Sequence, residues 1–189
     1  MYSKDHILIL EGVLSPEFCN EVIEKFKTDA HVADDPQPDY SKRRYLNLSE
    51  QNSWLTQLST LLDCSNDVAE KFFHSREDLM DVSVPDWVDD GFIMSCYSPG
   101  DDLVLHVDGQ SCDHPYNGLR LATLVLFLND CEGGELYFPV QDRTIKPKQG
   151  RAVIFPPGYT HPHEVKTTNS SRFIIQTWLT DPSLEVIER

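Results

Sequence analysis

A chain of 189 residues is long enough for one domain with a substantial core, and 40% hydrophobic with 25% charged residues is ordinary for a globular protein. The formal net charge of −15 argues against nucleic acid as the main partner, because like charges repel. The five cysteines form no C-x-x-C pair, which disfavours a zinc ribbon or a redox pair.

The sequence also argues against a membrane partner. No apolar run approaches the length of a membrane span, and the first residues lack the charged-then-apolar layout of a signal peptide. We therefore expect a cytoplasmic protein, and the sequence leaves its oligomeric state open.

The first quarter of the chain predicts a strand, a helix and a loop. The apolar run 7–10 is typical of a strand, and Ser15 followed by Pro16 is a helix start. Apolar residues then recur at helical spacing up to about Lys27. Residues 28–41 are rich in Asp and Pro, which indicates a loop that either covers a site or simply connects elements.

The second quarter predicts a short strand at 45–48 and helix over 49–73. The polar residues 64–67 interrupt the apolar pattern, so we expect one helix broken there or two shorter ones. Residues 75–90 are acidic and irregular, again either a lid over a site or a surface connection.

From Gly91 onward, short apolar runs alternate with turn residues, which predicts a mainly β core of sandwich or jelly-roll type. We expect one domain over 1–189, with a helical support layer over 1–90 and the jelly-roll core over 91–182. The predicted strands are 92–97, 103–107, 120–128, 135–138, 152–155 and 172–179.

The stretch His106-Val107-Asp108 carries the first candidate site residues. Side chains two apart share a face of a strand, so a strand through Asp108 places an imidazole beside a carboxylate. One further histidine would complete the 2-His-1-carboxylate set that suits Fe(II) with open coordination positions. Alone, the tripeptide is more often a surface strand with a hydrogen-bonded histidine.

Two later histidines are candidates for the missing ligand. His161 and His163 follow an apolar run, and Arg172 opens the next predicted strand. A guanidinium near the metal suits a dicarboxylate co-substrate, because it binds a carboxylate through two hydrogen bonds. An arginine at a strand start is otherwise more often solvated or ion-paired.

Several ordered motifs occupy the second half of the chain. They are Y-S-P-G-D at 97–101 leading to H-V-D at 106–108, the strand and L-N-D turn at 120–130, G-G-E-L at 133–136, and G-R-A-V-I-F-P at 150–156. In this order they resemble the motifs of the Fe(II)/2-oxoglutarate dioxygenases of the prolyl 4-hydroxylase-like group, and the resemblance covers about 92–178.

The resemblance implies a double-stranded β-helix and a set of site residues. His106, Asp108 and one late histidine would bind Fe(II), and the spacing of nine residues to Arg172 favours His163, whereas His161 lies eleven before it. Arg172 would bind the distal carboxylate of 2-oxoglutarate, with Tyr97 as a hydrogen-bond donor. Thr123 and Thr177 lie on strands expected to line the pocket, and Thr123 is expected to contact the co-substrate.

The implied activity is hydroxylation of a C–H bond with release of succinate and CO2. Its cofactors are Fe(II), 2-oxoglutarate and O2, with ascorbate as an optional addition. Peptidyl proline is the first substrate to consider, while free amino acids, other protein side chains and small metabolites stay open. The alternatives are a cupin-like metal oxygenase or isomerase that needs no 2-oxoglutarate, and a non-catalytic jelly-roll binding protein.

Overall fold

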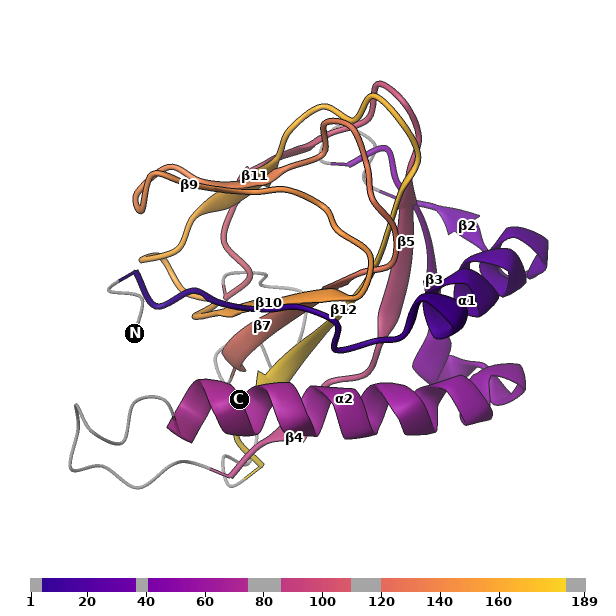
Figure 1. The fold of residues 1–189 in the computed structure, drawn as a ribbon, viewed down its shortest axis with the longest axis horizontal. Helices are drawn as coiled ribbons and strands as arrows, with labels where there is room; N and C mark the ends of the chain where they lie inside the picture. Colours follow the sequence, from indigo (N-terminus) through magenta and orange to yellow (C-terminus); the bar gives the residue numbers. More distant parts are fainter. Residues whose placement is uncertain (1–4, 37–40, 75–85, 110–119, 183–189) are drawn as a thin grey trace, which may run out of the picture.

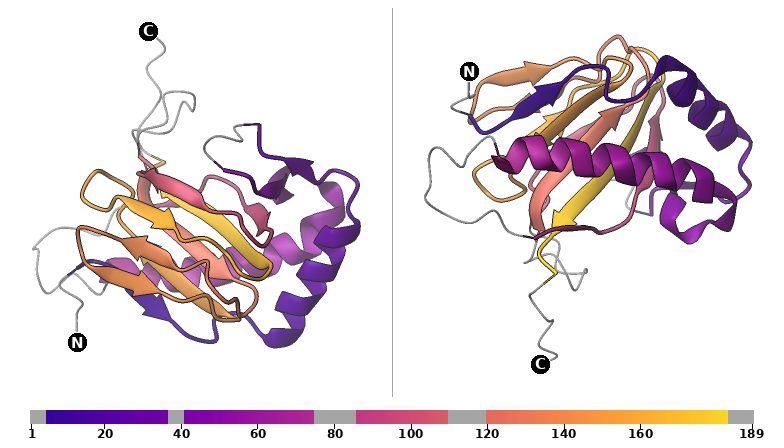
Figure 2. Two further views of the ribbon diagram at one scale, coloured as in Figure 1. Left: turned by 90° about the horizontal axis from the view of Figure 1, so that it is seen from above. Right: turned by 60° about the horizontal axis from the view of Figure 1, so that its bottom comes forward.

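The computed structural model describes residues 5–36, 41–74, 86–109 and 120–182, and its described part consists of two antiparallel sheets with two helices outside (Figure 1). The four-stranded sheet and the eight-stranded sheet face one another, and the helices lie on the far side of the larger one (Figures 1 and 2). This arrangement of two facing antiparallel sheets is the predicted jelly roll.

The larger sheet has the strand order β1-β10-β7-β12-β5-β3-β2, with β4 paired to β12. These strands are β1 (Leu8–Leu10), β2 (Ala33–Asp34), β3 (Arg44–Asn47), β4 (Val88–Asp89), β5 (Ile93–Tyr97), β7 (Arg120–Phe127), β10 (Arg151–Phe155) and β12 (Arg172–Thr180). The smaller sheet has the order β6-β11-β8-β9, formed by β6 (Leu103–His106), β8 (Leu136–Phe138), β9 (Arg143–Ile145) and β11 (His163–Val165).

The central strands β7, β10 and β12 of the larger sheet are buried on both faces, which explains why the sequence shows continuous apolar runs there instead of alternation. In β7, Leu124 and Leu126 pack in the core beneath the helices. Their neighbours Val125 and Phe127 pack in a second core between the two sheets. The inner face of the larger sheet is therefore the face on which a site between the sheets is built.

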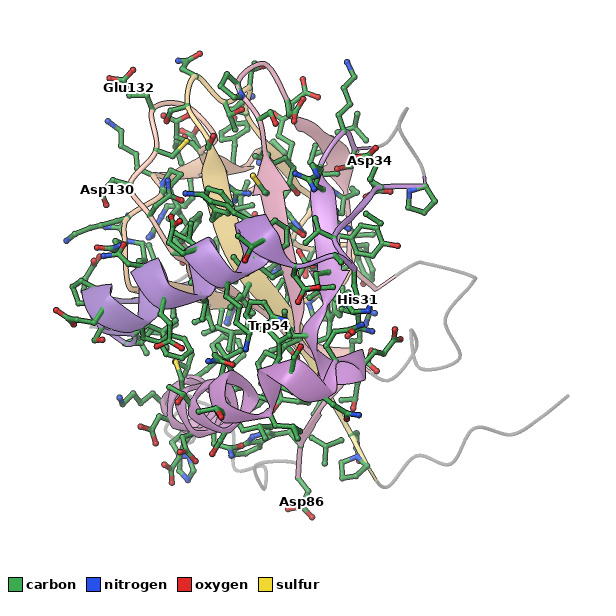
Figure 3. The ribbon with its side chains drawn as sticks, turned by 90° about the vertical axis from the view of Figure 1, so that its right-hand side faces the viewer. His31, Asp34, Trp54, Asp86, Asp130 and Glu132 are labelled. Carbon is green, nitrogen blue, oxygen red and sulfur yellow. The ribbon has the colours of Figure 1, made fainter. Side chains whose placement is uncertain are left out.

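The helices cover the outer face of the larger sheet. Helix α1 (Pro16–Thr28) begins as predicted, with the Ser15 hydroxyl accepting a hydrogen bond from the Phe18 backbone N–H. Two 3₁₀ turns (Leu48–Glu50 and Asn52–Trp54) lead into α2 (Leu55–His74). Figure 3 shows Trp54 between the two helices, where it is fully buried.

The break predicted in the second helix is wrong, because α2 runs without interruption through 64–67. Leu61, Cys64, Ser65, Val68 and Ala69 are all buried, at the spacing of one helical face. The Ser65 hydroxyl donates to Asp89 Oδ1 at 2.9 Å, so this polar residue is accommodated on the buried face.

The part of the chain before residue 90 supplies more than helices. It contributes β1, β2, β3 and β4 to the larger sheet, of which β1 and β3 match predicted strands. The short strands β2, β4, β9 and β11 have no counterpart among the predicted ones. Of the two expected cover segments, residues 37–40 of the segment 28–41 and residues 75–85 of the segment 75–90 lie outside the described residues.

Within the described ranges, no helix is long and apolar enough to cross a membrane.

Candidate active site

Two histidines face each other across the smaller sheet. His163 in β11 is the register partner of His106 in β6, and their ring centroids lie 4.3 Å apart. Asp108 completes the group: the three residues offer ligand atoms that all lie within 4.8 Å of one another. The structure thus brings together His106, Asp108 and His163.

The expected strand through Asp108 is wrong in its extent. Strand β6 ends at His106, and Asp108 lies in the turn that follows. Its carboxylate nevertheless reaches the imidazoles, with Oδ1 3.4 Å from His106 Nε2 and Oδ2 3.7 Å from His163 Nε2. The turn, instead of strand alternation, therefore sets this geometry.

Both imidazoles are oriented by backbone carbonyl groups. His106 Nδ1 lies 2.8 Å from the Val104 carbonyl oxygen, and His163 Nδ1 lies 3.0 Å from that of His161. An Nδ1–H that donates to a carbonyl leaves the Nε2 lone pair for a metal. Burial lowers the pKa of His163 despite the nearby Asp108 carboxylate, which favours the neutral, metal-binding form.

Hydrogen bonds from two side chains orient Asp108. The Thr123 hydroxyl donates to Asp108 Oδ2 at 2.7 Å, and Arg120 Nη1 donates to the Asp108 carbonyl at 2.7 Å. Burial by itself raises the pKa of Asp108, but the contact with His106, the nearby His163 and the Thr123 hydroxyl outweigh it and hold that pKa well below its usual range. The group is therefore an ionised oxygen ligand.

His161, the other candidate ligand, faces away from this group. Its Nε2 lies 2.8 Å from the Asp5 carbonyl oxygen, and its Nδ1 lies 2.9 Å from the Thr160 hydroxyl. With both ring nitrogens engaged elsewhere, His161 ties the N-terminal segment to the loop before β11. Its own carbonyl accepts from His163, so it supports the site through the backbone.

Arg172 lies in the same pocket and has hydrogen-bond donors that are not used. The side chain is 1% exposed, and its Nε and Nη1 find no hydrogen-bond partner within the described ranges. The same holds for the hydroxyl of Tyr97, its register partner on β5. Buried donors without partners are costly, so this pair is suited to an anionic ligand that enters the pocket.

The G-G-E-L motif explains how Arg172 is seated. Gly134 has φ +66°, and a Cβ atom added there would lie 2.8 Å from Arg172 Cδ and 3.0 Å from Thr168 Cγ2. Only glycine accepts both this backbone conformation and this close approach.

The pocket between the sheets has a volume of about 90 Å³. All six predicted site residues line it, but their roles differ in detail: the Thr123 hydroxyl is engaged by Asp108, which indicates that it orients the carboxylate instead of binding the co-substrate. Thr177 was expected to line the pocket and does not. Its hydroxyl donates to Asp89 at 3.1 Å on the outer face of β12.

Sequence reasoning missed Trp178 and Gln176, which line the pocket, and placed Arg43 only among the residues before the core that are within reach of a substrate. Strand alternation offered a signal for the first two, because residues 172, 174, 176 and 178 share one face of β12. Arg43 comes from a separate strand region, and no motif marks it.

The residues present fit an iron ion with a dicarboxylate co-substrate. Two imidazole nitrogens and one carboxylate form the donor set of non-haem Fe(II) oxygenases. The orphaned donors of Arg172 and Tyr97 in the same pocket supply a carboxylate-binding end.

Comparison with known proteins points to the same chemistry. Residues 92–180 match the family model of the 2OG-Fe(II) oxygenase superfamily, where 2OG is 2-oxoglutarate. The chain is 35% identical to prolyl 3-hydroxylase 2 of Gallus gallus over 99 residues, which cover 47% of this chain and 14% of that relative. The match thus spans a small part of the relative's length.

Solved structures share the fold across nearly the whole chain. A viral collagen prolyl hydroxylase from Paramecium Bursaria Chlorella virus-1, solved with 2OG, superimposes with a TM-score of 0.65 at 23% identity, covering 93% of this chain and 95% of that one. A prolyl hydroxylase from Trichoplax adhaerens, in complex with a peptide fragment of hypoxia inducible factor, gives a TM-score of 0.73 at 17% identity, covering 94% and 84%. At these identities the solved structures show that the chain shares their fold, while residues 92–180 match the model of the 2OG-Fe(II) oxygenase superfamily.

Proposed function

We propose that this chain is an Fe(II)- and 2-oxoglutarate-dependent dioxygenase that hydroxylates a proline residue of a peptide or protein. The observation that carries the proposal is one pocket with a metal-binding trio at one end and a buried arginine with unpaired donors at the other, within the described residues. A binding protein without catalysis has no need for both.

Each side chain has a distinct task in this proposal. His106, Asp108 and His163 would hold the iron, and Arg172 with Tyr97 would bind the distal carboxylate of 2-oxoglutarate. Iron and 2-oxoglutarate, when bound, would activate O2, of which one oxygen atom enters the substrate as hydroxyl and the other enters succinate as 2-oxoglutarate loses CO2. The closed inner face, with Val125, Ile174 and Leu136 around the pocket, limits access of water.

Peptidyl proline is supported as substrate by the names of the similar proteins. The matching relative is a prolyl 3-hydroxylase, and the similar structures are prolyl hydroxylases, one of them solved with a peptide. Because one of these names specifies the 3-position and the other two specify no position, the ring carbon that is oxidised is a separate question for experiment.

The test is turnover of the purified chain with Fe(II), 2-oxoglutarate and a panel of proline-containing peptides that includes poly(L-proline). The proposal predicts that succinate and a peptide carrying one added oxygen atom form in equal amounts. Amino-acid analysis of the product then separates 3-hydroxyproline from 4-hydroxyproline. Asp108→Asn, which removes the anionic ligand but keeps the size of the side chain, is expected to abolish both products.

Three other outcomes have clear meanings. Iron binding with oxygen uptake but no succinate would contradict the role of 2-oxoglutarate and favour a cupin-like oxygenase. Succinate that forms only with a non-peptide substrate would keep the reaction class and overturn the proline assignment. Peptide binding without any oxidation would favour a non-catalytic binding protein.

A further inference from the structure

A second arginine, Arg43, lines the pocket that holds Arg172 and Tyr97. It precedes β3 and lies outside the segment 92–180 that matches the family model. Its role is therefore a property of this chain's N-terminal part.

The register of the larger sheet puts the three residues in one row. Arg172 pairs with Tyr97, and Arg44 pairs with Cys96, the residue before Tyr97. Continuing the β3–β5 pairing by one residue places Arg43 beside Tyr97, on the inner face. The phenol thus lies between the two arginines.

The two arginines differ in how their charge is balanced. Arg43 Nε donates to Asp35 Oδ2 at 2.9 Å, and both side chains are largely buried, at 16% and 8% exposure. The ion pair has no net charge, whereas Arg172 makes no salt bridge within the described ranges. An unbalanced guanidinium attracts a carboxylate, but a neutralised one is suited to an uncharged oxygen acceptor.

Arg43 also reaches toward the metal-binding end. Its Nη1 lies 3.4 Å from Gln176 Oε1, and Trp178, the next inward residue on β12, pairs with Thr123. Because Thr123 holds Asp108, the row from Gln176 to Thr123 leads from the carboxylate-binding end to the metal-binding end. The Arg43 guanidinium therefore lines the part of the pocket between the carboxylate-binding end and the metal-binding end.

We propose that Arg43 is a substrate-positioning residue that donates a hydrogen bond to a backbone carbonyl oxygen of the bound peptide. Its partner Asp35 fixes the orientation of the guanidinium and balances its charge. The 2-oxoglutarate carboxylate therefore binds at Arg172, and Arg43 is left to donate to the uncharged peptide amide. This inference rests on the proposed function, because it assigns a role in binding that function's peptide substrate.

The test compares Arg43→Gln with Arg44→Gln, its neighbour on the opposite face. Arg44 is 52% exposed and lies 3.9 Å from Asp34, which is 91% exposed and points outward near the sheet edge (Figure 3). Binding of fluorescently labelled poly(L-proline) is measured by anisotropy under nitrogen with Fe(II) and 2-oxoglutarate. The affinity for 2-oxoglutarate is measured on the same samples from the visible band of its iron complex.

Loss of one hydrogen bond from a charged donor is expected to weaken peptide binding about ten- to a hundred-fold in Arg43→Gln. Its affinity for 2-oxoglutarate should match that of the wild type, and Arg44→Gln should bind both like the wild type. Arg172→Gln should show the opposite pattern, with a larger loss of affinity for 2-oxoglutarate than for the peptide.

Two results would overturn the inference and leave the proposed function intact. Equal peptide affinity in Arg43→Gln and wild type would remove the role of Arg43, and a loss of 2-oxoglutarate affinity as large as that of Arg172→Gln would move Arg43 to the co-substrate site. A wild type that shows no band, or that binds none of the proline-containing peptides of the panel, would instead contradict the proposed function itself. If the thermal melt shows that Arg43→Gln does not fold, Arg43→Lys replaces it, because this variant keeps the positive charge beside Asp35. Arg43→Lys is expected to lose peptide affinity while it keeps 2-oxoglutarate affinity. An unaltered peptide affinity in Arg43→Lys would refute the inference.

Discussion

The hydroxyl of Thr123 offers the cleanest perturbation of the iron site. Thr123→Val replaces that hydroxyl by a methyl group of similar size, so packing on the inner face is kept and the 2.7 Å hydrogen bond to Asp108 Oδ2 is removed. A hydrogen bond to a charged group contributes about 1.5 to 3 kcal/mol. Asp108 keeps its contacts with both histidines, so we expect iron binding to weaken about ten- to a hundred-fold, as is typical for groups that orient a ligand.

Anaerobic calorimetric titration with Fe(II) measures this effect, with Thr177→Val as the matched control. Thr177 is as buried as Thr123 and also donates to an aspartate, but on the outer face of the sheet. The control should bind iron like the wild type even if its melting temperature falls. Wild-type iron affinity in Thr123→Val, or an equal loss in Thr177→Val, would refute the reasoning.

Three further predictions concern stability. Arg172→Met removes buried unpaired donors, so the free energy of unfolding without ligand should stay the same or rise by up to about 3 kcal/mol, while 2-oxoglutarate binding should be abolished. A large loss of stability in chemical denaturation would contradict this prediction. Gly134→Ala should destabilise the fold by about 1 to 3 kcal/mol more than Gly12→Ala, because both glycines have a positive φ but a Cβ added at Gly12 meets no atom within 4 Å. Equal denaturation midpoints for the two variants would show that the added Cβ at position 134 does not clash. Burial raises the pKa of Asp89, so the folded state binds this proton at higher pH than the unfolded state does, and the stability of the fold falls as pH rises through that pKa. Asp89→Asn should therefore stabilise the protein more at neutral than at mildly acidic pH. A pH-independent difference in melting temperature between the variant and the wild type would contradict this prediction.

Much of the fold followed from local patterns. Helix α1 begins at the Ser15–Pro16 signal, and the six predicted strands of the second half all form, with shifts of one residue or so at their ends. These elements carry strong local signals: a cap with helical periodicity, or an apolar run between turn residues.

What local patterns missed was decided by tertiary contacts. Polar residues 64–67 suggested a break in α2, but Ser65 finds Asp89 as a hydrogen-bond partner from a distant strand. The short strands β9 and β11 have too few residues for a pattern and exist because neighbouring strands pair with them. A single sequence does not reveal such partners.

The site divides in the same way. Spacing favoured His163 over His161, and the structure agrees, because the register sets His163 opposite His106. The place of Arg43 in the pocket follows from the pairing of β3 with β5, two strands that lie far apart in the sequence.

The most direct test of the central claim is anaerobic titration with Fe(II) and then 2-oxoglutarate, following the weak visible charge-transfer band of the iron complex. We predict that the wild type and His161→Ala develop the band, that His163→Ala does not, and that Arg172→Ala needs far more 2-oxoglutarate to reach it. Iron binding by the wild type without any band would contradict the co-substrate assignment, and a band lost in His161→Ala but kept in His163→Ala would contradict the metal site.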